Sequence, residues 1–282
     1  MSWVCVNGEF VLDTDAKVSV WDHGYLYGDG LFETMRAYGG KIFALDAHLK
    51  RLRQGAKCLR LEINYADKQL QCLLQETIWR NDLASAYIRL TYSRGAGPIG
   101  LDPDLCPTGT LVIMAKPSQV APVIYSEGIS LGVSPIRRNH PAALSPAIKS
   151  LNFGNNILAK IWAKEHGYDD ALMLNQDGWL TETTVSNLFF VKGAAVFTPA
   201  LNTGILAGVT RECIINSTKV EQGMYALSQL LDADEIFLTN SGSEVIPVCA
   251  LDGRIVGNGK PGMLTKQIHS DFQQLVREKL QI

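Results

Sequence analysis

The chain has 282 residues, of which 46% are apolar, so its length predicts two domains or one large one and its composition predicts a folded globular protein. Its 26 Lys and Arg against 28 Asp and Glu give a formal charge of -2 without a run of one sign, which argues against a dedicated binder of nucleic acid or of an anionic membrane. No apolar run is long enough for a membrane span and the N-terminus lacks the pattern of a secretion signal, so we expect a cytoplasmic protein.

Cysteine and histidine spacing gives no sign of a metal site or a disulfide framework. The six cysteines are scattered without a Cys-x-x-Cys spacing, and no pair of the five histidines has the spacing of metal ligands. We therefore predict mostly buried, reduced thiols and no bound metal.

The first third of the chain mixes strand and helix patterns. The turn pair Asn7-Gly8 between two short apolar runs predicts a hairpin, and apolar residues at helical spacing from Leu45 to Leu59 predict an amphipathic helix. Predicted strands cover residues 4–6, 10–12, 18–21, 31–38, 86–93 and 111–115, and predicted helices cover residues 45–59 and 66–80.

A polar stretch with prolines at both ends, residues 117–122, predicts a linker. Beyond it, predicted strands cover residues 129–133, 171–174, 179–183, 188–191, 195–197, 235–238 and 244–248, and predicted helices cover 155–166, 210–215, 225–231 and 264–280. We therefore expect an α+β protein with a small N-terminal domain over residues 1–116 and a larger domain over residues 123–282.

Four sequence features could carry chemistry. Lys149 follows a proline-bounded loop among apolar and neutral residues, where desolvation lowers the pKa of an amine and makes it nucleophilic, although an exposed loop lysine fits the pattern too. Glu182 occurs in a Thr-rich, otherwise uncharged segment, which predicts a partly buried carboxylate with a cationic partner or else an exposed edge-strand residue.

The other two features suit a phosphate. The glycine-containing stretch 204–211 leads into a helix whose first amides could bind an anion, although such loops are common. Arg51, beside the apolar stripe of the first predicted helix, could do the same or could be a solvated helix residue. A nucleophilic lysine, a carboxylate for a pyridinium nitrogen and a phosphate cup are what pyridoxal 5'-phosphate (PLP) requires.

With these features the sequence resembles the class IV, fold-type IV PLP aminotransferases, from about Val6 to Gln267. This superfamily contains branched-chain aminotransferases, D-amino-acid aminotransferases and 4-amino-4-deoxychorismate lyases. The resemblance rests on six ordered motifs: Tyr27-Gly28-Asp29-Gly30-Leu31-Phe32-Glu33, His48-Leu49-Lys50-Arg51-Leu52, Ile148-Lys149-Ser150-Leu151-Asn152, Glu182 with Asn187-Leu188-Phe189, Gly208-Val209-Thr210-Arg211 and Ser243-Glu244-Val245-Ile246-Pro247-Val248.

The resemblance implies a small α/β domain followed by a larger, β-barrel-like α+β domain that binds the cofactor. It implies that Lys149 forms the Schiff base and later removes the Cα proton, and that Glu182 pairs with the ring nitrogen. The residues implied to hold the phosphate or the ring are Arg51, Val209, Thr210, Ser241 and Leu206, and those implied to bind substrate are Tyr27, Phe32, Arg36, Tyr87 and Arg89.

The subfamily stays open between three activities. Arg36 and the Tyr87-Ile88-Arg89 run resemble branched-chain enzymes, which implies an amino acid and a 2-oxo acid such as 2-oxoglutarate as substrates, ping-pong kinetics and a homodimer. Thr34, where those enzymes usually have glycine, Phe153, where they have tyrosine, and residues 183–186 resemble the lyase and D-amino-acid branches more. A binding protein that has lost turnover is the remaining alternative, and the presence of both Lys149 and Glu182 argues against it.

Overall fold

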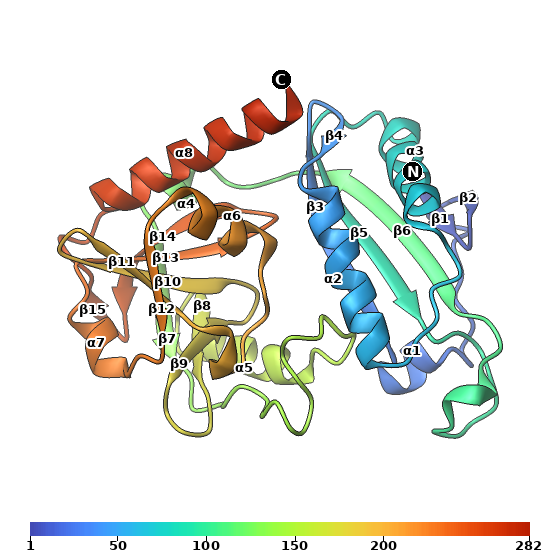
Figure 1. Ribbon diagram of the computed structural model, residues 1–282, viewed down its shortest axis with the longest axis horizontal. Coiled ribbons are helices and arrows are strands. Elements are labelled where there is room, and N and C mark those ends of the chain that lie inside the picture. The colour runs from blue at the N-terminus through green and yellow to red at the C-terminus, as the bar shows by residue number, and fades with distance from the viewer. The chain divides into compact units, whose positions relative to one another are not determined.

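The computed structural model describes residues 1–282, and the chain divides into two compact units that are described one at a time (Figure 1). Unit 1 contains Met1–Gln119, Ile148–Asn152 and Glu278–Ile282, and unit 2 contains Val120–Ala147 and Phe153–Arg277. The chain first passes from unit 1 to unit 2 between Gln119 and Val120, within the predicted linker 117–122. The short segment that carries Lys149 belongs to unit 1.

Unit 1 is built on a six-stranded antiparallel sheet with the strand order β2-β1-β6-β5-β3-β4. Asn7 and Gly8 both have positive φ between β1 and β2, as a two-residue hairpin turn needs, which confirms the predicted hairpin. The strands are β1 (Trp3–Val6), β2 (Glu9–Leu12), β3 (Gly30–Tyr38), β4 (Lys41–Ile42), β5 (Ala86–Ser93) and β6 (Thr110–Pro117).

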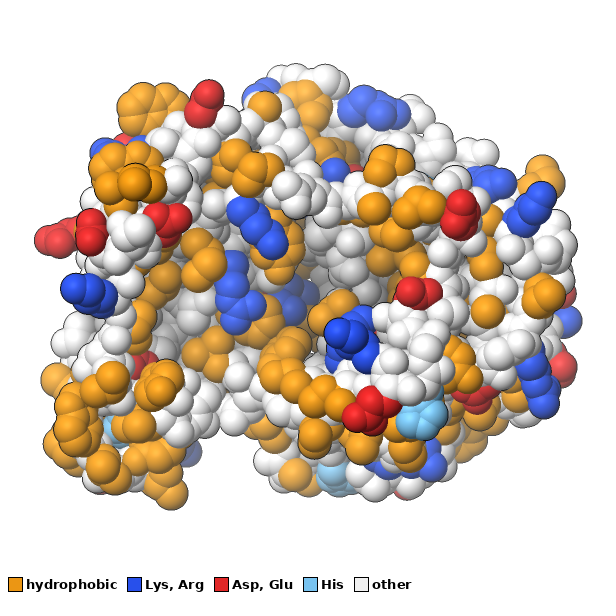
Figure 2. All heavy atoms as spheres, turned by 180° about the vertical axis from the view of Figure 1, so that it is seen from behind, with side chains coloured by type: hydrophobic (Ala, Val, Ile, Leu, Met, Phe, Trp, Pro, Cys, Tyr) orange, Lys and Arg blue, Asp and Glu red, His pale blue; other side chains and the backbone are white.

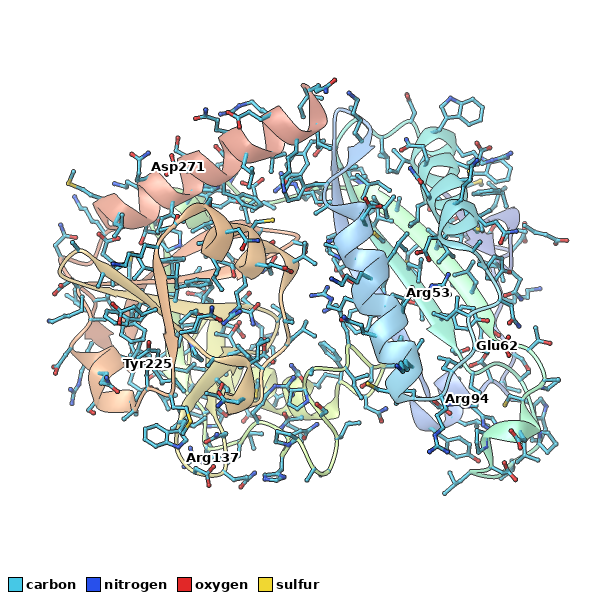
Figure 3. All side chains as sticks on the ribbon, in the orientation of Figure 1. Arg53, Glu62, Arg94, Arg137, Tyr225 and Asp271 are labelled. Atoms are coloured by element: carbon cyan, nitrogen blue, oxygen red, sulfur yellow. The ribbon has the colours of Figure 1, made fainter.

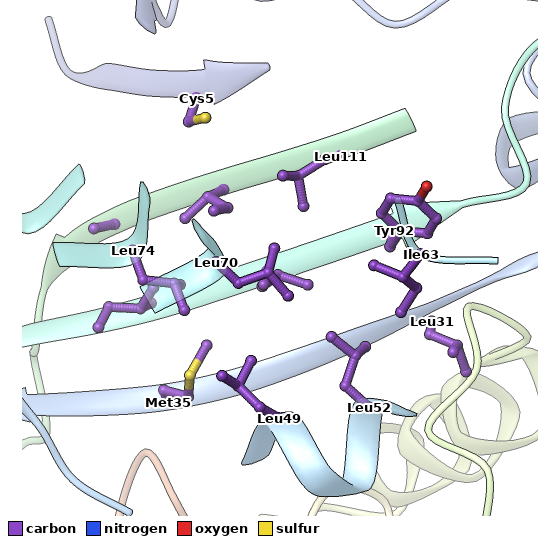
Figure 4. Packing of buried hydrophobic residues seen from close by; sticks show 14 of the residues in the cluster. Cys5, Leu31, Met35, Leu49, Leu52, Ile63, Leu70, Leu74, Tyr92 and Leu111 are labelled. Carbon is purple, nitrogen blue, oxygen red and sulfur yellow. The ribbon is translucent and has the colours of Figure 1, made fainter. Parts of the chain in front are cut away.

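Two amphipathic helices, α2 (Leu45–Cys58) and α3 (Asp67–Arg80), cover one face of this sheet, close to their predicted bounds. Leu70 and Leu74 of α3 and Leu49 and Leu52 of α2 pack with alternate residues of the strands in a continuous core (Figure 4). Because strand side chains alternate, the residues between those core positions lie on the opposite face of the sheet. Unit 1 also has a short helix α1 (His23–Tyr27) and a 3₁₀ turn η1 (Pro103–Leu105).

Unit 2 contains a nine-stranded sheet that closes on itself, which confirms the barrel-like expectation. Strand β9 pairs with β8 on one side and with β10 on the other, so that β10, β13, β14, β7, β8 and β9 form a ring. The strands are β7 (Ile129–Val133), β8 (Asp170–Leu174), β9 (Leu180–Thr183), β10 (Asn187–Lys192), β11 (Ala195–Pro199), β12 (Val220–Gly223), β13 (Glu235–Asn240), β14 (Glu244–Leu251) and β15 (Arg254–Ile255).

Most residues of the barrel strands are buried, because apolar side chains fill the interior and helices pack on the outside. Every residue of β8 and β9 is buried, and Leu172, Leu180, Leu188 and Leu238 belong to one core cluster. The helical elements of unit 2 are α4 (Val123–Ser126), α5 (Gly154–Glu165), η2 (Leu201–Thr203), α6 (Val209–Ser217), α7 (Leu227–Leu231) and most of α8 (Met263–Leu280).

One predicted strand is absent. Residues 18–21 form no strand, although Val18 and Val20 alternate with polar residues, because no neighbouring strand pairs with them and both valines are exposed. The predicted helix over 225–231 begins only at Leu227, since Ala226 is extended and makes a β-bridge with Trp179.

Both signs of charge are present on the surface, as the balanced composition suggests. Figure 2 shows basic and acidic side chains among apolar and uncharged ones on the visible face, with several of the basic ones in its middle. All six cysteines are free; Cys5, Cys213 and Cys249 are buried as expected, whereas Cys58 and Cys72 are exposed, so the prediction of mostly buried thiols is only half right. None of the helices has the length and apolar character that crossing a bilayer requires.

Candidate active site

The segment Ile148–Asn152, which carries Lys149, lies beside the N-terminal end of β3 in unit 1. The backbone N–H of Phe32 donates to the Lys149 carbonyl (3.0 Å), the N–H of Leu151 donates to the Gly30 carbonyl (2.9 Å), and Leu31 and Ser150 form a β-bridge. Gly30 allows this close approach, since a Cβ there would lie 2.7 Å from the Leu151 side chain. Backbone hydrogen bonds of Lys149 and Leu151 therefore attach this segment to β3.

Two cationic groups meet the ring of Phe32. The Lys149 Nζ atom lies 4.5 Å from the ring centroid and the guanidinium carbon of Arg89 lies 3.8 Å from it. Burial lowers the pKa of Arg89, whose Nε donates to the Thr91 hydroxyl (3.2 Å). Phe32 thus brings together the amine and one of the two arginines predicted to bind substrate.

The helix-free face of the sheet carries further predicted substrate residues. Arg36 is paired in register with Tyr87, and Thr34 with Arg89, so all four side chains lie on this face beside Phe32. The Tyr87 and Thr34 hydroxyls are 3.4 Å apart. Tyr27 lies elsewhere, at the end of α1, with its ring edge-on to His23 and its hydroxyl accepting from the Gly100 N–H (3.2 Å).

Arg51 is part of a buried cluster on the helix-covered side of β3. Its Nε and Nη2 donate to the two carboxylate oxygens of Glu33 at 2.8 and 2.6 Å, and His48 Nδ1 lies 2.8 Å from Glu33 Oε2. Burial alone would raise the pKa of Glu33, but the Arg51 charge and the hydrogen bonds from Arg51 and His48 outweigh it and lower the pKa to about 2. Glu33 is therefore ionised at neutral pH.

In unit 2, Glu182 lies where the barrel closes, opposite Asn187 in the β9–β10 pairing. Its Oε1 accepts from Arg138 Nε (3.0 Å), and its Oε2 accepts from Asn187 Nδ2 (3.0 Å) and from the Leu206 N–H (3.1 Å). Glu182 is 5% exposed and Arg138 7%. The uncharged segment around Glu182 therefore does indicate a buried carboxylate with a cationic partner.

The start of α6 lies against the same cluster. Gly208 is the N-cap, and a Cβ at this position would be 1.9 Å from Asn187 Oδ1, so only glycine lets the backbone approach the Asn187 amide. Val209 and Thr210 are the first residues of the helix and both are buried. Arg211, whose Nη2 donates to the Pro199 carbonyl and to Gln222 (both 2.9 Å), fastens the helix to the neighbouring strands.

A tight turn after β13 contains the predicted phosphate ligand Ser241. Asn240 Oδ1 accepts from the N–H groups of Gly242 (2.9 Å) and Ser243 (2.7 Å), and its Nδ2 donates to Ser186 (2.8 Å), between β9 and β10. Just before the turn, the buried Thr239 hydroxyl has no hydrogen-bond partner. A buried hydroxyl without a hydrogen-bond partner is consistent with a site that binds an additional polar group.

Arg94, labelled in Figure 3, follows directly after β5 and has a structural role. Its guanidinium pairs with Asp29, and its Nη2 also donates to the Leu59 carbonyl after the end of α2 (2.9 Å). The side chain is 8% exposed, so it holds the loop and the helix of unit 1 together.

Sequence reasoning missed the partners of the charged residues. Glu33, His48 and Asn187 stand within the quoted motifs but had no predicted role, and Arg138 was not singled out at all. The one available signal is Glu33 itself, a carboxylate at a core-facing position of a strand whose other core-facing residues, Leu31, Met35 and Ala37, are apolar; such a carboxylate requires a cation.

Comparison with known proteins places the chain in a family. The Amino-transferase class IV family model matches residues 30–251. A Methanocaldococcus jannaschii protein provisionally named a branched-chain-amino-acid aminotransferase is 40% identical over 278 residues, covering 96% of each chain, and the aminodeoxychorismate lyase of Bacillus subtilis is 36% identical over 262 residues, covering 88% of this chain and 86% of the lyase.

Among solved structures, the T.th. branched-chain amino acid aminotransferase with pyridoxamine 5'-phosphate superposes with a TM-score of 0.93 at 31% identity, covering 98% of this chain and 94% of that one. Fold, length and sequence agree, and the matched relatives support transamination as the reaction. The chain therefore belongs to the class IV aminotransferase family of PLP-dependent enzymes.

Proposed function

We propose that this enzyme transfers the amino group of a branched-chain amino acid to a 2-oxo acid such as 2-oxoglutarate, with PLP as cofactor. The relative at 40% identity and the structure with pyridoxamine 5'-phosphate support this reaction and this cofactor. When bound, PLP supplies an electron-accepting ring for the charge that develops at Cα of the substrate.

The residues present fit this cofactor chemically. The amides of Val209 and Thr210 open a helix, where anions bind, and the orphaned Thr239 hydroxyl lies beside the turn that contains Ser241. Glu182 has three donors on its two oxygens and retains acceptor capacity for a fourth. We infer that the phosphate and ring are held by Arg51, Glu182, Leu206, Val209, Thr210 and Ser241, and the aldehyde carbon by Lys149.

Each charged residue has a distinct task in this proposal. Lys149 would take up the Cα proton at Nζ and later return a proton. Glu182, kept in place by Arg138, Asn187 and the Leu206 amide, holds a proton on the ring nitrogen.

The observation that carries the substrate assignment is the array of Phe32, Arg36, Tyr87 and Arg89 beside Lys149. The Arg89 guanidinium carbon and the Lys149 amine lie 3.8 and 4.5 Å from the centre of the same ring, which supports binding of the substrate carboxylate by Arg89 close to the amine that the substrate replaces. Two arginines on this face match the two carboxylates of 2-oxoglutarate, and the aromatic rings suit an apolar side chain. We include Tyr27 among the substrate-binding residues.

We further propose that the enzyme acts as a cytoplasmic homodimer. Trp21, Tyr25 and Leu101 of unit 1 are 53, 75 and 83% exposed, and large exposed apolar side chains support association with a second copy. Sedimentation velocity on the purified enzyme tests this assignment, with a single monomeric species as the contrary result.

A half-reaction tests the function directly. The PLP form is mixed with L-leucine alone, L-valine alone or D-alanine alone, and the loss of the cofactor's absorption band is followed. We expect conversion with the branched-chain L-amino acids and, after addition of 2-oxoglutarate, recovery of the band with formation of glutamate. Lys149→Ala should abolish both conversion and borohydride fixation of the cofactor to protein, whereas the exposed Lys164→Ala should retain both.

Aminodeoxychorismate lyase activity is the second candidate. It is favoured by the 36% identity to the Bacillus subtilis lyase and by Thr34 and Phe153, which depart from the branched-chain pattern; Phe153, the N-cap of α5, cannot donate a hydrogen bond to the cofactor's phenolic oxygen. Pyruvate released from aminodeoxychorismate, without glutamate from leucine and 2-oxoglutarate, would replace the first proposal by the second. Conversion with D-alanine only would instead assign the D-amino-acid specificity.

A further inference from the structure

We propose that Glu33 is a positioning residue for cofactor binding, because it holds the Arg51 guanidinium by one edge and so fixes the orientation in which Arg51 binds the phosphate. The inference rests on the proposed phosphate role of Arg51 and adds a residue to which neither the motifs nor the relatives' names assign a task. Glu33 itself would not contact the phosphate.

The geometry of the pair defines the orientation. Glu33 binds Nε and Nη2 of Arg51 through separate oxygens, at 2.8 and 2.6 Å, so one edge of the guanidinium is fully used. Glu33 does not use the edge formed by Nη1 and Nη2, and this is the edge that we assign to the phosphate. A bidentate pair prevents rotation of the guanidinium plane, which a single hydrogen bond would allow.

A third contact fixes the carboxylate in turn. His48 precedes Arg51 by three residues, so both side chains leave the same side of α2, and His48 Nδ1 lies 2.8 Å from Glu33 Oε2. Burial lowers the pKa of His48, and the charges of Arg51 and Lys149 lower it further against the opposing effect of Glu33. Neutral His48 then donates from Nδ1, and Glu33 is held from two positions on one helix.

The strand that carries Glu33 also positions the catalytic lysine. Phe32, the preceding residue, donates its backbone N–H to the Lys149 carbonyl and has the Lys149 amine over its ring. Consecutive residues of β3 thus direct Lys149 on one face of the sheet and, through Glu33, Arg51 on the other. An error in either contact would alter the placement of phosphate relative to amine.

Electrostatics makes the proposal testable, because charge and orientation act in opposite directions. The Glu33 carboxylate is an anion beside a proposed phosphate site, so by charge alone its removal should strengthen phosphate binding. Its benefit must come from orienting Arg51. In Glu33→Gln the charge is lost, and the amide NH₂ would face a donor of Arg51 or His48, so the bidentate pair cannot re-form.

The test compares PLP with pyridoxal, which lacks the phosphate. The full-length chain is stripped of cofactor, and the dissociation constants of PLP and pyridoxal are measured by absorbance titration for wild type and Glu33→Gln. We expect the PLP constant to rise about tenfold or more and the pyridoxal constant to change by less than about threefold. Glu76→Gln, in an exposed ion pair with Arg80, is the matched control and should change neither constant.

Several results would overturn the proposal. Equal weakening for both ligands would mean a general structural role, and unchanged or tighter PLP binding would mean that charge outweighs orientation. If Glu33→Gln does not fold, Glu33→Asp, which keeps the charge but is one methylene shorter, carries the same comparison with the same expected result. A wild type that shows no preference for PLP over pyridoxal refutes the inference, whereas absence of leucine transamination refutes only the proposed substrate.

Discussion

The buried Glu33 cluster predicts a specific pH dependence of stability. The pKa of Glu33 is lowered from 4.5 to about 2, and this difference corresponds to about 3 kcal/mol of folding free energy. Because the pKa is lower in the folded state, the contribution is fully present above about pH 4.5 and is lost as the pH falls toward 2. Glu33→Gln, whose neutral amide imitates the protonated acid, should lack this contribution at every pH.

Urea unfolding of the cofactor-free chain at pH 7, 5, 4 and 3 measures the effect. The wild type should exceed Glu33→Gln by about 3 kcal/mol at pH 7 and pH 5, and the difference should shrink steadily below pH 4.5. Glu76→Gln, in an exposed pair with Arg80, should differ from wild type by less than about 1 kcal/mol at each pH. A Glu33→Gln difference that stays constant from pH 7 to pH 3 would refute the reasoning, because ionisation would then not be its source.

Two further predictions concern packing. Gly208→Ala places a Cβ against Asn187 and should weaken PLP binding by about tenfold or more, as measured by titration of the cofactor-free chain. Gly154→Ala is the control and should leave the affinity unchanged, because no atom lies within 4 Å of a Cβ added there. Equal PLP affinities for the two variants would contradict the contact between Gly208 and Asn187. Leu74→Ala should lower the free energy of unfolding by about 2–5 kcal/mol, whereas Trp79→Ala, in the same helix but 71% exposed, should lower it by less than about 1 kcal/mol in urea titrations, and similar losses would argue against the assigned core.

Local patterns predict the elements well where the signal lies in neighbouring residues. The Asn7-Gly8 turn and the helical spacing of Leu45, Leu49 and Leu52 both correspond to observed structure. Residues 18–21 have a strand-like composition but form no strand. Strand formation depends on a neighbouring strand, and the sequence of the segment itself does not reveal whether one is there.

In the candidate site, sequence patterns likewise do not identify which charged residues pair with each other. The surroundings of Glu182 indicate a buried carboxylate, yet its partner Arg138 is 44 residues earlier in the chain and Arg51 is 18 residues from Glu33. A carboxylate at a core-facing strand position indicates that a cation is needed. It does not say which of the 26 lysines and arginines provides the charge, since only the packing of α2 on β3 selects Arg51.

The return of Ile148–Asn152 to unit 1 has a consequence for folding during synthesis. When residues 1–119 have left the ribosome, Gly30 and Phe32 at the N-terminal end of β3 still lack the backbone partners that Lys149 and Leu151 provide. Unit 1 is thus completed only after much of the following chain has been made, and a nascent chain that stops before Ile148 would display an unfinished sheet edge. A fragment ending at Gln119 should be correspondingly prone to self-association.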